Sequence, residues 1–219
     1  MTFKYSPFIL FFATLGLAAC THEGSSPGDD AAAGAGAPVA TEEQATRVAI
    51  LLAEGFHDGE AYMTHGFLSN HGCEVDVIGI EKGKVTAYNS NFTIDVQKRV
   101  SDVSVADYDA LVLPGGKGPA VLREHDEVLD FVRSFWQTEK PIAAICHGPQ
   151  VLISAGLLDG VRATGVSGIK DELLEAGAKY EDSPLVTDRQ LITSRVPDDL
   201  PKFASHIART IEKREERGL

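Results

Sequence analysis

Short apolar runs that alternate with stretches of helical spacing constrain the fold of this chain more than any other feature of its sequence. Continuous apolar runs occur at residues 46–53, 110–113 and 141–145, and residues 73–80 alternate between apolar and polar side chains. Continuous runs are typical of strands that are buried on both faces of a parallel sheet. Amphipathic stretches connect them, the longest expected over residues 120–138. The pattern predicts an α/β domain with a mostly parallel sheet and helices on both faces.

The beginning of the chain has a different character from the rest. Lys4 precedes an apolar run at residues 8–17, which is too short to span a bilayer comfortably and is typical of a signal peptide. The run ends at Leu17-Ala18-Ala19-Cys20, which resembles a bacterial lipobox, the motif in which the cysteine is lipidated. We therefore expect residues 1–19 to be a lipoprotein signal peptide. The alternative is an ordinary secretory signal with an incidental cysteine.

Residues 20–45 would hold the lipidated Cys20 and a flexible tether. This segment is rich in Gly, Ala, Ser and Pro, so it cannot bury enough apolar surface to fold. More than one acyl chain on Cys20 would make the anchoring stable. Residues 46–219 then form a single domain, expected on the periplasmic side of the inner or outer membrane of a bacterium. The lipid would be its only contact with the membrane.

Charge and cysteine content narrow the possible functions. The formal net charge of −12 argues against a nucleic-acid partner, because such binding depends on a basic surface. Besides Cys20, the chain has only Cys73 and Cys146, too few for a disulfide framework. Cys73 begins an expected strand and is predicted to be a core residue. Cys146 needs another explanation.

Three segments are predicted to meet at one edge of the sheet. Residues 54–57, 114–116 and 145–148 each follow an expected strand. Ligand sites in open α/β sheets form beyond the carboxyl ends of the strands. We therefore expect these segments to form one crevice.

Cys146 lies on a tight turn between a strand and a helix, where a side chain stands exposed above the sheet as in a nucleophile elbow. The start of the following helix should stabilise a thiolate and lower the pKa of Cys146 below the ~8.5 of a free thiol. The backbone N–H groups of Gly116 and His147 could together bind a developing oxyanion. The alternative is an inert core thiol at the end of a strand.

Several motifs in this order resemble the ThiJ/PfpI family. They are Glu54-Gly55-Phe56, Leu113-Pro114-Gly115-Gly116, residues 143–150 with 152–156, and Thr193-Ser194-Arg195 with Pro197. The resemblance implies a flavodoxin-like three-layer sandwich, related to class I glutamine amidotransferases, that assembles into a homodimer or a larger homo-oligomer. The activities it implies are cysteine peptidase, glyoxalase and deglycase, with redox-sensing or chaperone roles as alternatives.

Two positions depart from the pattern of the family. The family glutamate that points at the cysteine is expected two residues after Gly55, where this chain has His57. Asp58 and Glu60 are interpreted as first-turn helix residues that the helix dipole favours. Peptidase-like members carry an orienting acid at the position of Ala120, which has no carboxylate, and this makes peptidase activity less favoured. Glu124, the nearest acidic residue along the chain, lies about one helical turn further on.

Two other classes of site are less consistent with the sequence. Glutamine amidotransferases need a later His-x-Glu, but His206 is the only later histidine and is followed by Ile207-Ala208. Cys146, His57 and His147 could in principle bind zinc, but no metal-binding spacing supports such a site. We therefore expect neither a metal nor a cofactor.

The favoured hypothesis is an enzyme that acts on a small-molecule substrate, a reactive carbonyl or related electrophile. Cys146 would add to the carbonyl, His57 would move the proton, and the amides of Gly116 and His147 would hold the oxyanion. The expected pocket residues, besides His147, are Glu54, Gly115 and Arg195. The rival hypotheses are a peptidase and a non-enzymatic redox sensor or holdase in which Cys146 is oxidised.

Overall fold

The computed structural model describes residues 45–218 of the 219-residue chain. The predicted signal peptide at 1–19, the lipidation site Cys20 and the tether up to residue 44 lie outside the described residues. No helix within 45–218 has both the length and the apolar character needed to span a bilayer.

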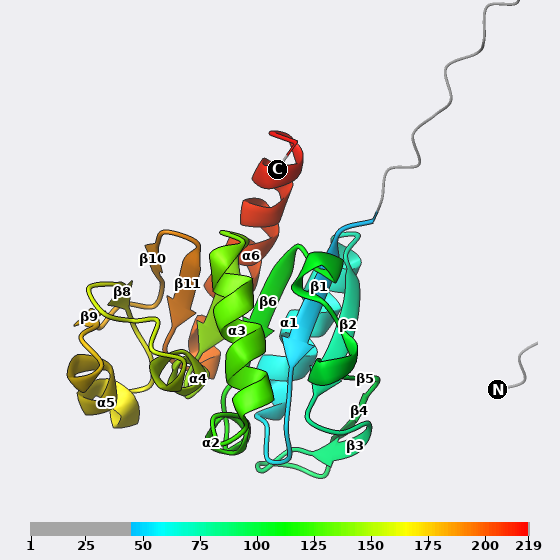
Figure 1. Cartoon of the computed structure of the whole chain (residues 1–219), viewed down its shortest axis with the longest axis horizontal. Coiled ribbons are helices and arrows are strands. Elements are labelled where there is room, and N and C mark those ends of the chain that lie inside the picture. Colours follow the sequence, from blue (N-terminus) through cyan, green and yellow to red (C-terminus); the bar gives the residue numbers. More distant parts are fainter. Residues whose placement is uncertain (1–44, 219) are drawn as a thin grey trace, which may run out of the picture. The chain divides into compact units, whose positions relative to one another are not determined.

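A seven-stranded sheet forms the centre of the domain, and its strand order confirms the predicted parallel arrangement (Figure 1). All neighbouring strands pair in parallel except the pair at one edge, where β10 runs antiparallel to β11. In sheet order the strands are β10 (Val186–Asp188), β11 (Leu191–Ser194), β7 (Ile142–Ile145), β6 (Ala110–Leu113), β1 (Arg47–Leu51), β2 (Glu74–Gly79) and β5 (Lys98–Arg99).

Helices cover both faces of the sheet. One face carries α1 (Asp58–Asn70) and α6 (Leu200–Glu215), and the other carries α2 (Gly118–Leu122), α3 (Asp126–Gln137) and α4 (Pro149–Ser154). Side chains of β1 alternate between the two cores: Ala49 and Leu51 pack on the α3 side, whereas Val48 and Ile50 pack on the α1 side. This burial on both faces confirms the three-layer sandwich and explains the continuous apolar runs.

The smaller elements lie at the edges of the domain. β3 (Gly83–Thr86) and β4 (Thr93–Val96) form an antiparallel hairpin outside the main sheet. The pattern did not predict α5 (Lys170–Glu175) or the two-stranded parallel sheet of β8 (Arg162–Ala163) and β9 (Lys179–Tyr180). Four short 3-10 turns complete the described chain: Val100–Asp102, Val105–Asp107, Ser167–Ile169 and Pro197–Asp199.

The single helix expected over residues 120–138 is wrong, because the structure has two helices there. α2 ends at Leu122, and His125 adopts an extended conformation before α3 begins. In the gap, Arg123 donates hydrogen bonds to Ser154 and Glu172. These contacts to distant segments interrupt the helix, and apolar spacing along the sequence cannot reveal them.

Candidate active site

Cys146 lies on a strained turn at the carboxyl end of β7. Its φ of 61° is in the left-handed region, which non-glycine residues rarely adopt. Its backbone N–H donates to the Ser194 carbonyl, and its carbonyl accepts from the N–H of Val166, so neighbouring segments hold the turn in place. α4 begins three residues later at Pro149. The turn agrees with the predicted elbow, but the expectation that the side chain stands exposed above the sheet is wrong, because Cys146 is buried, with 7% exposure.

Two glycines allow the chain to pack closely around this turn. A Cβ on Gly148 would lie 2.1 Å from the carbonyl oxygen of Leu113, so only glycine fits there. A Cβ on Gly115 would lie 2.7 Å from Cβ of Cys146 and 2.8 Å from Oε2 of Glu60. The missing side chain at Gly115 therefore lets the thiol and the carboxyl group approach each other.

Glu60 is the acidic group of the site, although the sequence interpretation assigned it to the helix dipole. It lies in the first turn of α1 and is completely buried, with 0% exposure. Its Oε2 accepts a 2.6 Å hydrogen bond from the N–H of Gly115. Its Oε1 has no hydrogen-bond partner within residues 45–218, and the carboxyl group lies close enough to Cys146 for each group to affect the pKa of the other. A buried carboxyl group directed at the thiol is a candidate acid–base group.

Backbone hydrogen bonds fix the segment before α1 to the loop after β6. The N–H of His57 donates to the carbonyl of Gly115, and the N–H groups of Lys117 and Gly118 both donate to the carbonyl of Gly55. Gly116 adopts a φ of 87° at this junction, and a Cβ there would lie 2.6 Å from the carbonyl oxygen of Gly55. The position of the Glu60 helix relative to the turn therefore depends on backbone contacts.

Near neutral pH, the pKa values of the two groups keep Cys146 as a neutral thiol, whereas the carboxyl group of Glu60 can gain or lose a proton. Burial, with a smaller effect of Glu60, raises the pKa of Cys146 to about 12, against the opposing N–H groups of Gly116 and His147. Burial raises the pKa of Glu60 to about 7, although its hydrogen bond from Gly115 opposes this. The expectation of a lowered Cys146 pKa is therefore wrong, because desolvation and a nearby negative charge outweigh the start of α4. The N–H groups of Gly116 and His147 both act on the sulfur, and their expected role in binding an oxyanion stays a prediction.

His147 flanks the sulfur from the other side. Its Nδ1 lies 3.3 Å from Sγ of Cys146. Burial lowers the pKa of His147, and the negative charge of Glu172 opposes this effect. Glu172, from α5, is held by hydrogen bonds of 2.7 Å from Arg123 and 2.8 Å from Gln150. Within residues 45–218, the acid that acts on His147 is Glu172 of α5, and not a residue at the position of Ala120 or Glu124.

His57 lies at the rim of the site. Its Nδ1 is 3.5 Å from an oxygen of Asp58, and its ring meets the ring of Tyr88 edge-on at 5.8 Å. Within residues 45–218, no hydrogen bond or ion pair joins His57 to Cys146. Burial lowers the pKa of His57, so the imidazole is neutral at neutral pH. The geometry gives the proton-handling position to Glu60, and His57 instead shapes the entrance with Tyr88.

Comparison with known proteins decides the family. Residues 46–210 match the DJ-1/PfpI family. The chain belongs to the DJ-1/PfpI family. Protein/nucleic acid deglycase 2 of Escherichia coli (strain K12) is 39% identical over 159 residues, which cover 72% of this chain and 92% of that protein. General stress protein 18 of Bacillus subtilis (strain 168) is 39% identical over 169 residues, covering 76% and 98%.

Solved structures agree with this DJ-1/PfpI assignment. Drosophila melanogaster DJ-1beta superposes with a TM-score of 0.72 at 31% identity and covers 78% of this chain and 95% of that chain. A two-domain protein of Anabaena variabilis, with DJ-1/ThiJ/PfpI-like and ferritin-like domains, gives a TM-score of 0.75 at 35% identity over 76% of this chain. This chain spans about half of that longer protein, 48% of its length.

The DJ-1/PfpI glutamate expected at position 57 is supplied in this domain by Glu60. His57 precedes α1 in an extended conformation, whereas Glu60 lies in the first helical turn and is directed back over the sheet edge. The expected position of the family glutamate, two residues after Gly55, is therefore wrong, because the carboxylate lies further along the chain, at Glu60. A signal was available, because Glu60, Thr64 and Leu68 follow helical spacing on the buried face of α1.

Two of the residues expected to line the pocket of this DJ-1/PfpI domain have other partners. Glu54 is exposed and accepts a hydrogen bond from the N–H of Thr86 in β3. Arg195 donates to Asp182 and Asp199, which raise its pKa, so it ties α6 to the loop before β10. Asp199 directly precedes α6, and its side chain makes no capping hydrogen bond. Of the three expected pocket residues, only Gly115 lies against Cys146.

Proposed function

We propose that this protein is a cysteine-dependent enzyme that acts on small reactive carbonyls, in the manner of a glyoxalase or deglycase. The proposal is carried by one observation: the buried carboxyl group of Glu60, with a pKa raised to about 7, lies against the Cys146 thiol. A general base is most effective when its pKa is close to the working pH. Relatives at 38–40% identity that are named deglycases support the same reaction class.

The first step is addition of the thiol to the carbonyl carbon. The sulfur forms a bond to carbon while Glu60 accepts the thiol proton, and the carbonyl π electrons move to oxygen. The N–H groups of Gly116 and His147, which already converge on the sulfur, lie where they could stabilise the negative oxygen. Protonation of that oxygen by Glu60 gives a neutral hemithioacetal and restores the carboxylate.

For an α-oxoaldehyde such as methylglyoxal, a second proton transfer completes the chemistry. Glu60 removes the proton from the former aldehyde carbon and returns it to the adjacent carbonyl carbon, through an enediol. The hydroxyl proton of the first carbon passes to the oxygen of the second carbon in the same rearrangement. The result is a thioester of a 2-hydroxy acid. Water then cleaves the S–C bond, which releases lactate and restores the Cys146 thiol. No net oxidation occurs, because one carbon is oxidised as its neighbour is reduced.

Peptidase activity is the less supported alternative. A Bacillus subtilis relative that is 39% identical over 157 residues carries a name that proposes a cysteine protease. In this chain, Ala120 has no carboxylate, and Glu172 acts on His147 while engaged with Arg123 and Gln150. A peptidase triad requires an acid that orients the imidazole. Peptide hydrolysis should therefore be much slower than carbonyl consumption.

The test is the rate of methylglyoxal consumption and lactate formation by the wild type and by Cys146→Ala, Glu60→Gln and His57→Ala. The matched control is Glu127→Gln, because Glu127 also lies in the first turn of a helix but is exposed. We expect Cys146→Ala and Glu60→Gln to lose at least 100-fold in kcat/KM, a loss typical of removed acid–base groups. Equal rates in Glu60→Gln and Glu127→Gln would contradict the proposal.

A redox-sensing role is the second candidate. The sulfur of Cys146 lies among two N–H donors and Glu60, a setting that would also stabilise an oxidised sulfinate. One relative is named general stress protein 18. A sensor would show stoichiometric oxidation of Cys146 by peroxide, seen by mass spectrometry, with no turnover of carbonyls. Turnover that exceeds one substrate per protein would exclude this role as the sole function.

We further propose that the chain is exported and lipidated at Cys20, as the lipobox-like sequence suggests. Incorporation of labelled palmitate by bacteria that express the wild type, and its loss in Cys20→Ser, would test this proposal. Assembly into a homodimer or larger homo-oligomer stays a prediction of the family resemblance. Light scattering of the purified domain would measure it.

A further inference from the structure

A second concave site lies at the opposite edge of the sheet from Cys146. It is an open cleft of about 550 Å³, referred to here as the basic cleft. Its lining includes Pro141 and Gln190, the residues just before β7 and β11, whereas Cys146 follows the last residue of β7. Because these strands are parallel, their starts lie at one edge of the sheet and their ends at the other. The basic cleft is therefore separate from the proposed active site.

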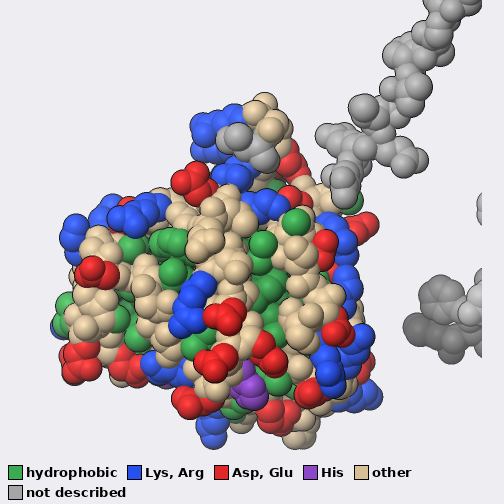
Figure 2. All heavy atoms as spheres, in the orientation of Figure 1, with side chains coloured by type: hydrophobic (Ala, Val, Ile, Leu, Met, Phe, Trp, Pro, Cys, Tyr) green, Lys and Arg blue, Asp and Glu red, His purple; other side chains and the backbone are tan. Residues whose placement is uncertain are grey.

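Cationic side chains dominate the basic cleft. The lining cations are Arg189, Lys213, Arg214 and Arg217, with His206 beside them and Glu139 as the only acidic residue. None of these four cations forms an ion pair with a carboxylate within residues 45–218. In a chain with a net charge of −12, such a group of unpaired cations is unexpected. Figure 2 shows Lys and Arg side chains gathered around the projecting end of α6.

The last turns of α6 and the residues just after it supply most of the cations of the basic cleft. His206, Thr210, Lys213 and Arg214 lie on α6 at helical spacing and line the cleft, and Arg217 follows the end of the helix. The acidic residues Glu212 and Glu215 line a different cavity, beside Cys73. Neither of these carboxylates lines the basic cleft.

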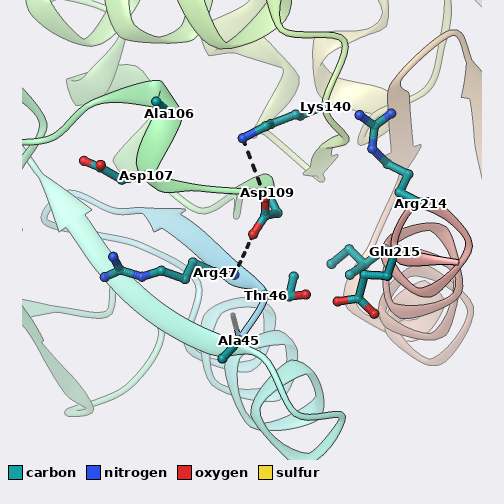
Figure 3. Close-up of a pocket in the computed structure, with 10 residues that line it drawn as sticks. Ala45, Thr46, Arg47, Ala106, Asp107, Asp109, Lys140, Arg214 and Glu215 are labelled. Carbon is teal, nitrogen blue, oxygen red and sulfur yellow. Dashed lines mark hydrogen bonds and ion pairs between the residues drawn. The ribbon is translucent and has the colours of Figure 1, made fainter. Parts of the chain in front are cut away.

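The neighbouring cavity provides a contrast. Figure 3 shows Lys140 directed at Asp109, whose other oxygen accepts a hydrogen bond from the N–H of Arg47. There, an acidic side chain neutralises the cation. Arg214 lines both cavities, and its guanidinium donates only to the backbone carbonyl of Glu139, at 3.2 Å. Arg189, Lys213 and Arg217 line the basic cleft without a carboxylate partner among the described residues.

Strained backbone marks the same cleft. Among residues 45–218, only Glu139, Cys146 and Arg189 combine a side chain with a positive φ. One is the proposed nucleophile, and the other two, with φ of 56° and 53°, line the basic cleft. Arg189 occupies the turn between β10 and β11, where glycine or asparagine would be less strained. Backbone strain of this kind is concentrated at functional sites.

We propose that the basic cleft binds a ligand through a phosphate group. A single guanidinium group is enough to pair with one carboxylate. A cleft lined by four cations is better suited to an anion with several charged oxygens. The phosphate could belong to a soluble phosphorylated compound or to the headgroup of an anionic lipid. The cleft lies at the edge of the sheet where β7 and β11 begin, so a ligand bound there leaves the Cys146 edge open.

Binding of inorganic pyrophosphate, measured by titration calorimetry, tests the proposal directly. Residues 45–218 have their own two-sided core, so a domain of residues 45–219 can be used without the preceding segment. The variant is Lys213→Glu with Arg217→Glu, and the matched control is Lys84→Glu with Lys179→Glu, which changes the net charge equally at exposed lysines outside the cleft. We expect the cleft variant to bind at least tenfold more weakly than the wild type and the control to bind within twofold.

A second arm distinguishes the source of the phosphate. The same proteins are sedimented with vesicles of phosphatidylcholine alone or mixed with phosphatidylglycerol. Cleft-dependent binding to the mixed vesicles, without measurable pyrophosphate binding, indicates a lipid headgroup, whereas cleft-dependent pyrophosphate binding alone indicates a soluble ligand. Failure of both probes, or equal losses in the cleft and control variants, would overturn the proposal. Circular dichroism and methylglyoxal consumption, unchanged in both variants, show that the domain is intact.

Discussion

Glu60 and Cys146 meet across the edge of the sheet, one from the first turn of α1 and the other from the strained turn after β7. The carboxyl group is completely buried, and the sulfur is nearly so. Burial raises the cost of charging either group. Glu60 adds to that cost for Cys146, whereas the Cys146 thiol favours the charged carboxylate.

The rate of carbonyl consumption should rise with pH as Glu60 loses its proton. The pKa of Glu60 is about 7, so kcat/KM should increase through neutrality and level off above pH 8. Glu60→Gln should remove this pH dependence together with at least 100-fold of the rate. The measurement is a pH profile of kcat/KM from pH 5 to 9. An unchanged profile in Glu60→Gln would assign the ionisation to another group.

The same substitution should stabilise the domain at high pH. Because folding raises the pKa of Glu60 from 4.5 to about 7, the folded state binds the proton more tightly, and stability falls as pH rises between these values. A shift of this size corresponds to about 3 kcal/mol at pH 8. Glu60→Gln should recover part of it, because the amide oxygen can still accept from Gly115. Urea unfolding at pH 5 and pH 8 measures the difference, and the exposed Glu127→Gln should show none.

Gly115→Ala should disrupt the site, whereas Gly66→Ala should not. The new methyl group at 115 would lie 2.7–2.8 Å from atoms of Cys146, Glu60 and His147. We expect a loss of about 1–3 kcal/mol in the free energy of unfolding, together with most of the activity. Gly66 is helical with open space around it, so alanine there should add up to about 1 kcal/mol. Thermal unfolding should show a lower melting temperature for Gly115→Ala and a higher one for Gly66→Ala. A change in the same direction in both variants would contradict the steric explanation.

Glu172→Gln should lower the pKa of His147. The negative charge of Glu172 raises that pKa against the effect of burial, so its removal shifts the titration to lower pH. Nuclear magnetic resonance of the imidazole protons measures the pKa directly. The control is Glu175→Gln, at an exposed position of the same helix. An unchanged His147 titration in Glu172→Gln would mean that the two groups do not interact.

Local patterns were enough to predict the sheet and the elbow, because both depend on short segments. The apolar runs mark β1, β6 and β7, and the strand-to-helix turn marks Cys146. The partners of Cys146 depend on contacts between distant segments. The spacing of Glu60 with Thr64 and Leu68 indicates the buried face of α1, but the contact of Glu60 with Cys146 depends on how that helix packs against the sheet. Glu172 follows an unpredicted 3-10 turn, so its effect on His147 had no signal in the local sequence.

The hydrogen bonds between Gly55 and the loop at 117–118 have a consequence for how such a domain can diversify. They hold the floor of the crevice through main-chain atoms, which survive substitution of most side chains nearby. His57 and Tyr88 lie at the entrance, and their side chains take no part in those bonds. New substrate preferences can therefore arise by replacing entrance side chains one at a time, while the reactive sulfur and its proton acceptor keep their geometry.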